Sequence, residues 1–95
     1  MQNWARDVAG LIRRRHPMAD SLLDVACGTG LHLSHLRNAF AHVEGLEISV
    51  AMRVAAVDRL DGITVHAGDM HDFQLHRTFS AVICFPGGVI NGHAS

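Results

Sequence analysis

One ten-residue stretch, residues 22–31, constrains the fold of this 95-residue chain more than any other part of it. Its sequence, LLDVACGTGL, leads from an apolar run through an acidic residue to a turn with two glycines, and a helical pattern follows at once. This order predicts a strand, a tight loop and a helix start. Glycine lets the backbone approach a ligand without a Cβ clash, and the free N–H groups of a helix start attract a carboxylate or a phosphate. The stretch therefore predicts a ligand-binding crevice.

Segments with helical and with strand-like patterns alternate along the rest of the chain. Strands are predicted at residues 21–26, 42–46, 63–66 and 80–85, and helices at residues 4–15, 31–40 and from about residue 50. Asn3 and Ser49 are the predicted caps of two helices, and Pro17 is the predicted stop of the first. This alternation indicates an α/β fold with an open parallel sheet. Right-handed crossovers give the strand order 3-2-1-4, with the helices mainly on one face and the switch point at residues 27–30.

Composition and charge exclude several classes of protein. The chain is 48% hydrophobic with a formal net charge of −1, which indicates one small globular domain without a basic surface for nucleic acid or anionic membranes. No apolar run reaches the ~18 residues of a membrane span. The two cysteines lack framework spacing and no signal peptide is recognisable, so we expect a cytoplasmic protein. The eight histidines match no zinc-ligand pattern, so no metal site is predicted.

Three acidic residues belong to the predicted carboxyl edge of the sheet. Asp24 lies in the glycine-containing stretch, Glu47 ends the second strand and Asp69 follows the third. Glu47 can there accept both hydroxyls of a ribose, and Asp69 can accept from an adenine amino group with Met70 against the ring. Plainer alternatives remain open, namely an ordinary turn for the glycines, a solvated loop position for Glu47 and a loop cap for Asp69.

Three successive segments resemble the motifs of S-adenosylmethionine-dependent methyltransferases of the Rossmann-like class. They are residues 22–30, residues 44–49 together with Met52, and residues 66–73. The chain is most similar to the N,N-dimethyltransferases that act on nucleotide-linked amino deoxysugars in macrolide pathways, and residues 73–83 continue the match. The resemblance implies a Rossmann-like sheet, S-adenosylmethionine as cofactor, and methyl transfer to the amine of a small-molecule acceptor such as a nucleotide-linked amino sugar.

The same resemblance implies roles for individual residues, although it identifies no catalytic base. Residues of the glycine-containing turn would line the methionine part of the cofactor, Ile48 would pack on the adenine, and Cys84 at the end of the fourth strand would approach the methionine end. For Cys84, simple core packing is the alternative. The expected cofactor-binding residues are Asp24, Ala26, Gly28, Gly30, Glu47, Ile48, Asp69, Met70 and Cys84.

Members of this family are considerably longer than the present chain. Residues 1–95 are therefore expected to form one partial, truncated domain, the cofactor-binding half, with a divergent tail at residues 86–95. Without the later helices, one face of the sheet and the edge of the fourth strand would be uncovered. Because open apolar edges pair with other chains, we expect self-association through this face and edge.

Two other functions compete with an N-methyltransferase. One is a non-catalytic remnant or interaction module with the same fold, and the other is a nicotinamide-dependent oxidoreductase that uses the same crevice. Leu33 stands where the dinucleotide fingerprint has its third glycine, and Gly68 to Met70 follow the third strand, which argues against the oxidoreductase. Binding of S-adenosylhomocysteine would separate the other two.

Overall fold

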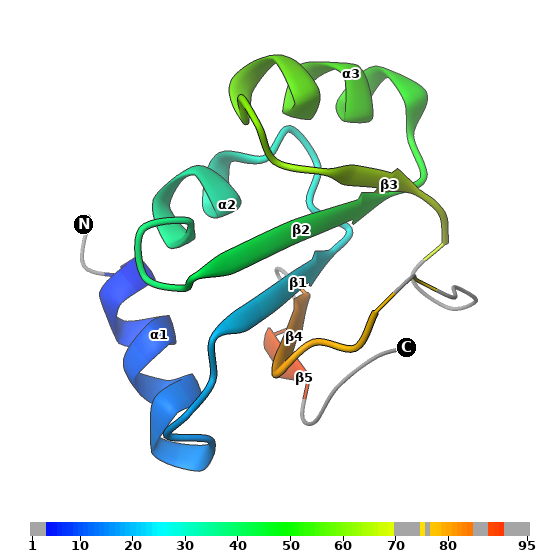
Figure 1. Ribbon diagram of the computed structural model, residues 1–95. Helices are drawn as coiled ribbons and strands as arrows, with labels where there is room; N and C mark the ends of the chain where they lie inside the picture. The colour runs from blue at the N-terminus through cyan, green and yellow to red at the C-terminus, as the bar shows by residue number, and fades with distance from the viewer. Residues whose placement is uncertain (1–3, 70–74, 76, 85–87, 91–95) are drawn as a thin grey trace.

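The computed structural model describes residues 4–69, 75, 77–84 and 88–90. Its elements in chain order (Figure 1) are α1 (Trp4–Arg15), β1 (Ser21–Val25), α2 (Leu31–Leu36), β2 (His42–Glu47), α3 (Val50–Arg59), β3 (Val65–Ala67), β4 (Ala81–Cys84) and β5 (Gly88–Ile90). Every predicted helix and strand is present, whereas the sequence pattern does not predict β5.

β1 is the central strand of the sheet and is buried along its whole length. It pairs in parallel with β2 on one side, where Leu22 lies opposite Val43, and with β4 on the other, where Leu22 lies opposite Ala81. A parallel strand that is covered on both faces has a nearly continuous apolar sequence, which is the pattern of β1. β1 ends at Val25, so the following loop begins at Ala26.

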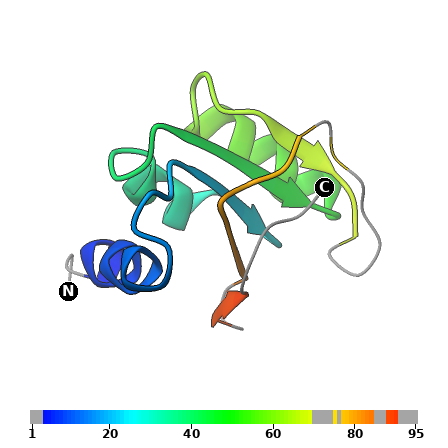
Figure 2. The same ribbon diagram turned by 60° about the horizontal axis from the view of Figure 1, so that its bottom comes forward.

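The strand order of the sheet is β3-β2-β1-β4-β5. The four parallel strands have the predicted order 3-2-1-4, and β5 adds an antiparallel partner to β4. Figure 2 shows α2 and α3 together on one face of the sheet, in agreement with the predicted one-sided arrangement of helices. The chain therefore has the expected Rossmann-like α/β fold.

Each face of the sheet carries a hydrophobic core. The core on the helix side joins α1, α2 and α3 to the sheet, and its buried members include Ile12, Leu33 and Ala56. The core on the opposite side consists of Leu23, Val25, Leu46, Phe79, Val82 and Cys84, with Leu75 packed against it. Alternation of side chains along each strand divides the apolar residues between these two cores.

Two expectations about uncovered sheet surfaces are wrong. β4 is not an edge strand, because β5 pairs with it. The face opposite the helices is not open either, since Leu23 is 0% and Val82 is 4% exposed. The segment between β3 and β4 contributes Leu75 and Phe79 to the core on this face. The face and the β4 edge on which the expected self-association depends are thus covered, whereas self-association itself stays a prediction.

The helix ends follow most of the local signals in the sequence. α1 ends two residues before Pro17, and Ser49 caps α3 because its Oγ accepts a hydrogen bond from the Met52 N–H at 3.3 Å. α2 is shorter than predicted and ends at Leu36. The predicted cap Asn3 lies outside the described residues. Within the described part of the chain, no helix has the length and apolar character needed to cross a membrane.

Candidate cofactor site

The loop between β1 and α2, here called the glycine loop, makes a tight turn at the carboxyl end of β1 (Figure 1). Three of its residues have a left-handed backbone, namely Ala26 (φ 62°), Gly28 (φ 59°) and Gly30 (φ 82°). This conformation costs alanine on the order of 1 kcal/mol but is open to glycine. The Cys27 N–H donates to the Leu46 carbonyl at 3.0 Å, which fixes the strained turn to β2.

The two glycines of this loop have different surroundings. A Cβ at Gly30 would lie 2.6 Å from Cδ1 of Leu60, so Gly30 is required for the close approach of the residue that follows α3. A Cβ at Gly28 would meet no atom within 4 Å. Gly28 is therefore the position at which the loop backbone is open to a ligand, and Gly30 has a packing role of its own.

Asp24 is buried near the end of β1, where its side chain is 1% exposed. Neither of its carboxylate oxygens has a hydrogen-bond partner among the described residues. Burial first, and the negative charge of Glu47 second, raise the pKa of the Asp24 carboxyl to about 7. A buried polar group without a partner is unfavourable by a few kcal/mol. Asp24 is thus suited to a cationic or hydrogen-bond-donating group that enters beside the glycine loop.

Glu47 connects the glycine loop to the turn before α3. Its Oε1 accepts a hydrogen bond from the Gly28 N–H at 2.7 Å, and its Oε2 accepts one from the Ser49 N–H at 2.9 Å. A carboxylate has about four lone-pair positions, so each oxygen can accept a further hydrogen bond. The sequence predicts that Glu47 faces the crevice, but it does not predict that this carboxylate also orders the loop.

Arg53 of α3 fixes the turn that follows β2. Its Nη1 donates to the carbonyl oxygen of Glu47 at 2.8 Å and to that of Ile48 at 3.3 Å. The side chain of Ile48 is 64% exposed next to this anchored backbone. An exposed aliphatic side chain beside a carboxylate suits a flat apolar ring. Sequence reasoning missed Arg53, and its only local signal is a position four residues after the helix cap.

The remaining predicted site residues follow β3 and β4. Asp69 is exposed just after β3, and the Gly68 N–H donates to the Glu47 carbonyl at 3.4 Å, which keeps the ends of β2 and β3 together. Met70 lies outside the described residues, so its place against an adenine stays a prediction. Cys84 is 8% exposed and packs in the core opposite the helices, at the carboxyl end of β4.

Both cysteines are free thiols. Burial, together with the charges of Asp24 and Glu47, raises the pKa of the Cys27 thiol to about 12. Cys27 packs in the helix-side core and Cys84 in the opposite core. Because the thiolate is the nucleophilic form of cysteine, Cys27 is a packing residue and not a candidate nucleophile.

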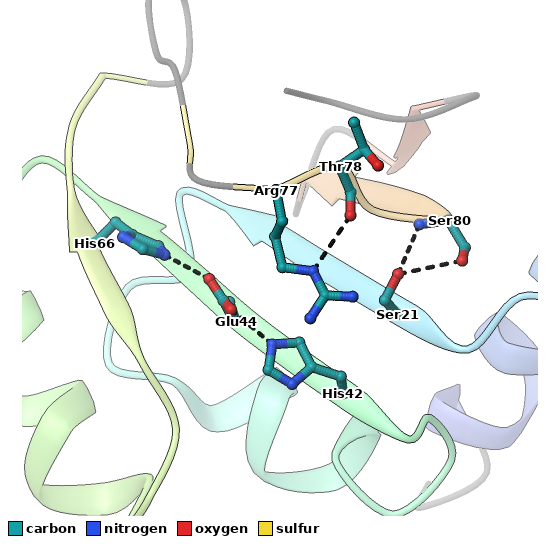
Figure 3. Close-up of polar contacts among 7 residues, drawn as sticks. All are labelled: Ser21, His42, Glu44, His66, Arg77, Thr78 and Ser80. Carbon is teal, nitrogen blue, oxygen red and sulfur yellow. Dashed lines mark hydrogen bonds and ion pairs between the residues drawn. The ribbon is translucent and has the colours of Figure 1, made fainter.

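A second polar cluster lies on the sheet face opposite α2 and α3 (Figure 3). Glu44 of β2 is 2% exposed, and its oxygens lie 2.6 Å from Nε2 of His42 and 2.5 Å from Nε2 of His66. At the start of β4, the Ser80 N–H donates to Oγ of Ser21 at 2.8 Å. The contact of Glu44 with His66 joins β2 to β3, and the contact of Ser21 with Ser80 joins β1 to the start of β4. Within the described residues, no three metal-ligating side chains are placed to hold a metal ion.

Similarity to known proteins agrees with this geometry. The model of the methyltransferase domain family matches residues 22–91. The dTDP-3-amino-3,6-dideoxy-alpha-D-glucopyranose N,N-dimethyltransferase of Streptomyces fradiae is 56% identical over 80 residues, which are 84% of this chain and 31% of that protein. The dTDP-3-amino-3,4,6-trideoxy-alpha-D-glucopyranose N,N-dimethyltransferase of Streptomyces venezuelae is 54% identical over 79 residues, 83% of this chain and 33% of that protein.

Solved structures of similar proteins superpose closely on the chain. S-adenosylmethionine-bound CalS10, an amino pentose methyltransferase from Micromonospora echinaspora involved in calicheamicin biosynthesis, has a TM-score of 0.84 at 51% identity, over 88% of this chain and 36% of that one. Streptomyces venezuelae DesVI has a TM-score of 0.85 with the same identity and coverage. The chain thus spans about a third of the length of these relatives. Its glycine loop, its fold and the family match over residues 22–91 together establish that the chain belongs to the methyltransferase domain family.

Proposed function

We propose that this site binds S-adenosylmethionine and that the chain is the cofactor-binding part of an N-methyltransferase for a nucleotide-linked amino sugar. The observation that carries the proposal is the buried Asp24 carboxylate, which has no partner among the described residues and lies close enough to Glu47 for their charges to interact. Two carboxylates below an open glycine backbone suit a ligand with cationic groups. The ammonium and sulfonium of S-adenosylmethionine are such groups.

Four of the predicted residues could contact this cofactor directly. Asp24 would accept from the ammonium, and the free lone pairs of Glu47 would accept from the ribose hydroxyls. Ile48 would cover one face of the adenine, and Asp69 would accept from its amino group. Because the Glu47 carboxylate already orders both the Gly28 N–H and the turn before α3, the ribose contact would form without rearrangement of the loop.

When bound, the cofactor supplies a methyl group that its sulfonium activates for transfer to a neutral amine. The chain contributes binding and orientation, and alignment of this kind can account for much of the rate of a group transfer. Relatives with 54% to 56% identity act on dTDP-linked amino sugars. By this similarity we infer a nucleotide-linked amino sugar as the acceptor. The whole chain would be one partial domain that holds the cofactor, in a cytoplasmic protein.

Calorimetric titration with S-adenosylmethionine and with S-adenosylhomocysteine tests the proposal. We expect saturable binding of both by the wild-type chain. Gly28→Ala should weaken binding at least tenfold, because its Cβ enters the open space at the loop. Gly62→Ala is the matched control, since Gly62 also has a positive φ (83°) and open surroundings but lies after α3. Both variants should lose a similar stability of about 1 kcal/mol.

Three outcomes would contradict parts of this function. No heat at millimolar ligand would remove the cofactor assignment. Equal weakening by both glycine variants would attribute the effect to backbone strain and not to the site. If the chain binds the cofactor but mass spectrometry detects no methylation of a dTDP-amino sugar, the chain is a cofactor-binding module without turnover.

A further inference from the structure

The outer face of α3 is largely apolar apart from the exposed Asp58, although most of this face is exposed to solvent. Val50, Val54 and Val57 are 65%, 64% and 55% exposed. Ala51 and Ala55 beside them are also exposed. These five residues are here called the α3 face. A surface helix normally presents charged and polar residues to water, and contiguous exposed apolar patches mark interaction surfaces. Figure 1 places α3 at the periphery of the molecule, where a second chain can approach it.

Among the described residues, the α3 face contributes little to packing, since its three valines are each more than half exposed. Ala56 is the only buried residue of α3, and the following residue Leu60 completes its inward side. Arg53 donates hydrogen bonds to the carbonyl oxygens of Glu47 and Ile48. The spacing of Val50, Val54 and Val57 at i, i+4 and i+7 forms one ridge along the helix. Such a ridge can pack against a second helix.

We propose that this face joins two copies of the chain in a weak two-fold dimer, with the two α3 helices antiparallel and Val54 near the axis. In this register Val50 of one copy lies opposite Asp58 of the other. The first turn of α3 has no acidic residue, and its free N–H groups favour a carboxylate. The exposed Asp58 of the second copy would supply one, and the symmetry repeats this contact at the other end.

The charge pattern favours a second copy over a different protein. With Val54 on the axis, Arg53 lies opposite Ala55 and Asp58 opposite Val50, so no like charges meet across the interface. The small side chains of Ala51 and Ala55 would allow close approach of the two helices. One helix from each copy buries less than the ~1,200 Å² of a standard interface. The dimer should therefore dissociate on dilution.

Sedimentation velocity over a range from about 5 to 500 μM tests the dimer. The weight-average mass of the wild-type chain should rise from 10.3 kDa with concentration. Val54→Glu should abolish this rise, because it places like charges on the axis. Leu11→Glu is the matched control, since Leu11 is an exposed apolar residue of a different helix (39% exposed), and it should associate as the wild type does.

Oxidative cross-linking tests the same register without reliance on a destabilised variant. Val54→Cys should give a covalent dimer under mild oxidant, because the two introduced thiols would meet near the axis. Met18→Cys, at a residue that is 83% exposed outside the helices, should remain monomeric under the same conditions. A wild-type chain that stays monomeric at 500 μM would overturn the dimer. Equal cross-linking of the two cysteine variants, or equal loss of association in the two glutamate variants, would overturn the assignment to α3.

Discussion

Asp24 links ligand binding to folding stability through the protonation of a single carboxyl group. Its pKa is raised from 3.8 to about 7 by burial and by Glu47. Between these values the unfolded chain ionises Asp24 while the folded chain keeps the proton. The contribution of Asp24 to the free energy of unfolding is therefore fully present below pH 4 and is lost as the pH rises through 7. The loss amounts to about 4 kcal/mol.

Asp24→Asn should remove this pH dependence. The amide stays neutral, so at pH 8 without ligand we expect the free energy of unfolding of the variant to exceed that of the wild type by about 2 kcal/mol. The difference is smaller than the full pH-dependent loss because the buried amide still lacks partners. Urea denaturation at pH 5 and pH 8 measures the effect. Asp61→Asn, at an exposed position, is the control. A pH dependence that is the same in the wild type and in Asp24→Asn would contradict this role of Asp24.

At the scale of single residues, the sequence predicts that Asp24 and Glu47 lie at the carboxyl ends of neighbouring strands, as they do in the structure, but it does not predict their partners. Glu47 and Asp24 are identified by their places at strand ends. The packing role of Gly30 depends on Leu60, thirty residues further along the chain. Such a contact is decided by how α3 settles on the glycine loop, and no local spacing encodes it.

At the scale of elements, the short edge strand β3 depends on contacts with β2 beyond its backbone ladder. β3 pairs only three residues with β2, from Gly45 opposite Val65 to Glu47 opposite Ala67. Glu44 adds side-chain contacts to His42 within β2 and to His66 on β3. Because β3 leads directly to Asp69, this cluster contributes to the placement of one wall of the proposed site.

Glu44→Gln should loosen β3 while leaving the central sheet intact. The amide is isosteric but must turn its NH₂ group toward one imidazole, so one of the two contacts is lost or weakened. We expect this to lower the free energy of opening of β3 by about 1–2 kcal/mol. Native-state hydrogen exchange should show faster exchange of the β3 amides. The amides of β1 in the same sample are the internal control. Unchanged protection of β3 would show that the backbone ladder alone holds this strand.

The ends of the elements are predicted less well than their order. β3 begins at Val65, two residues later than its pattern indicates. Gly62 takes a φ of 83°, and the Ile63 N–H donates back to the Leu60 carbonyl at 3.0 Å. The turn that closes α3 thus uses residues that read as strand in the sequence. Turn closure and strand propensity compete here, and the hydrogen bond to the end of α3 decides the outcome.

At the scale of the whole molecule, the order 3-2-1-4 can be predicted because it follows from periodicity and crossover handedness. The residues that cover the sheet face opposite the helices cannot be predicted in this way, because their packing depends on partners far away in the sequence. Leu75 and Phe79 come from a segment whose polar composition hides their packing. β5 has only three residues, and its existence depends on the free edge that β4 offers.

β5 should therefore be essential for protecting the β4 edge, and proline substitutions can test this. Successive N–H groups of a strand point to opposite sides, so of Val89→Pro and Ile90→Pro only one removes a donor to β4. The free energy of unfolding of that variant should fall by about 1–3 kcal/mol. The variant should also scatter light at high concentration, because β4 becomes an open apolar edge. The other keeps its ladder hydrogen bonds and should resemble the wild type, as edge strands tolerate proline on their outer side. If both variants match the wild type in urea denaturation and in light scattering, β5 does not protect β4.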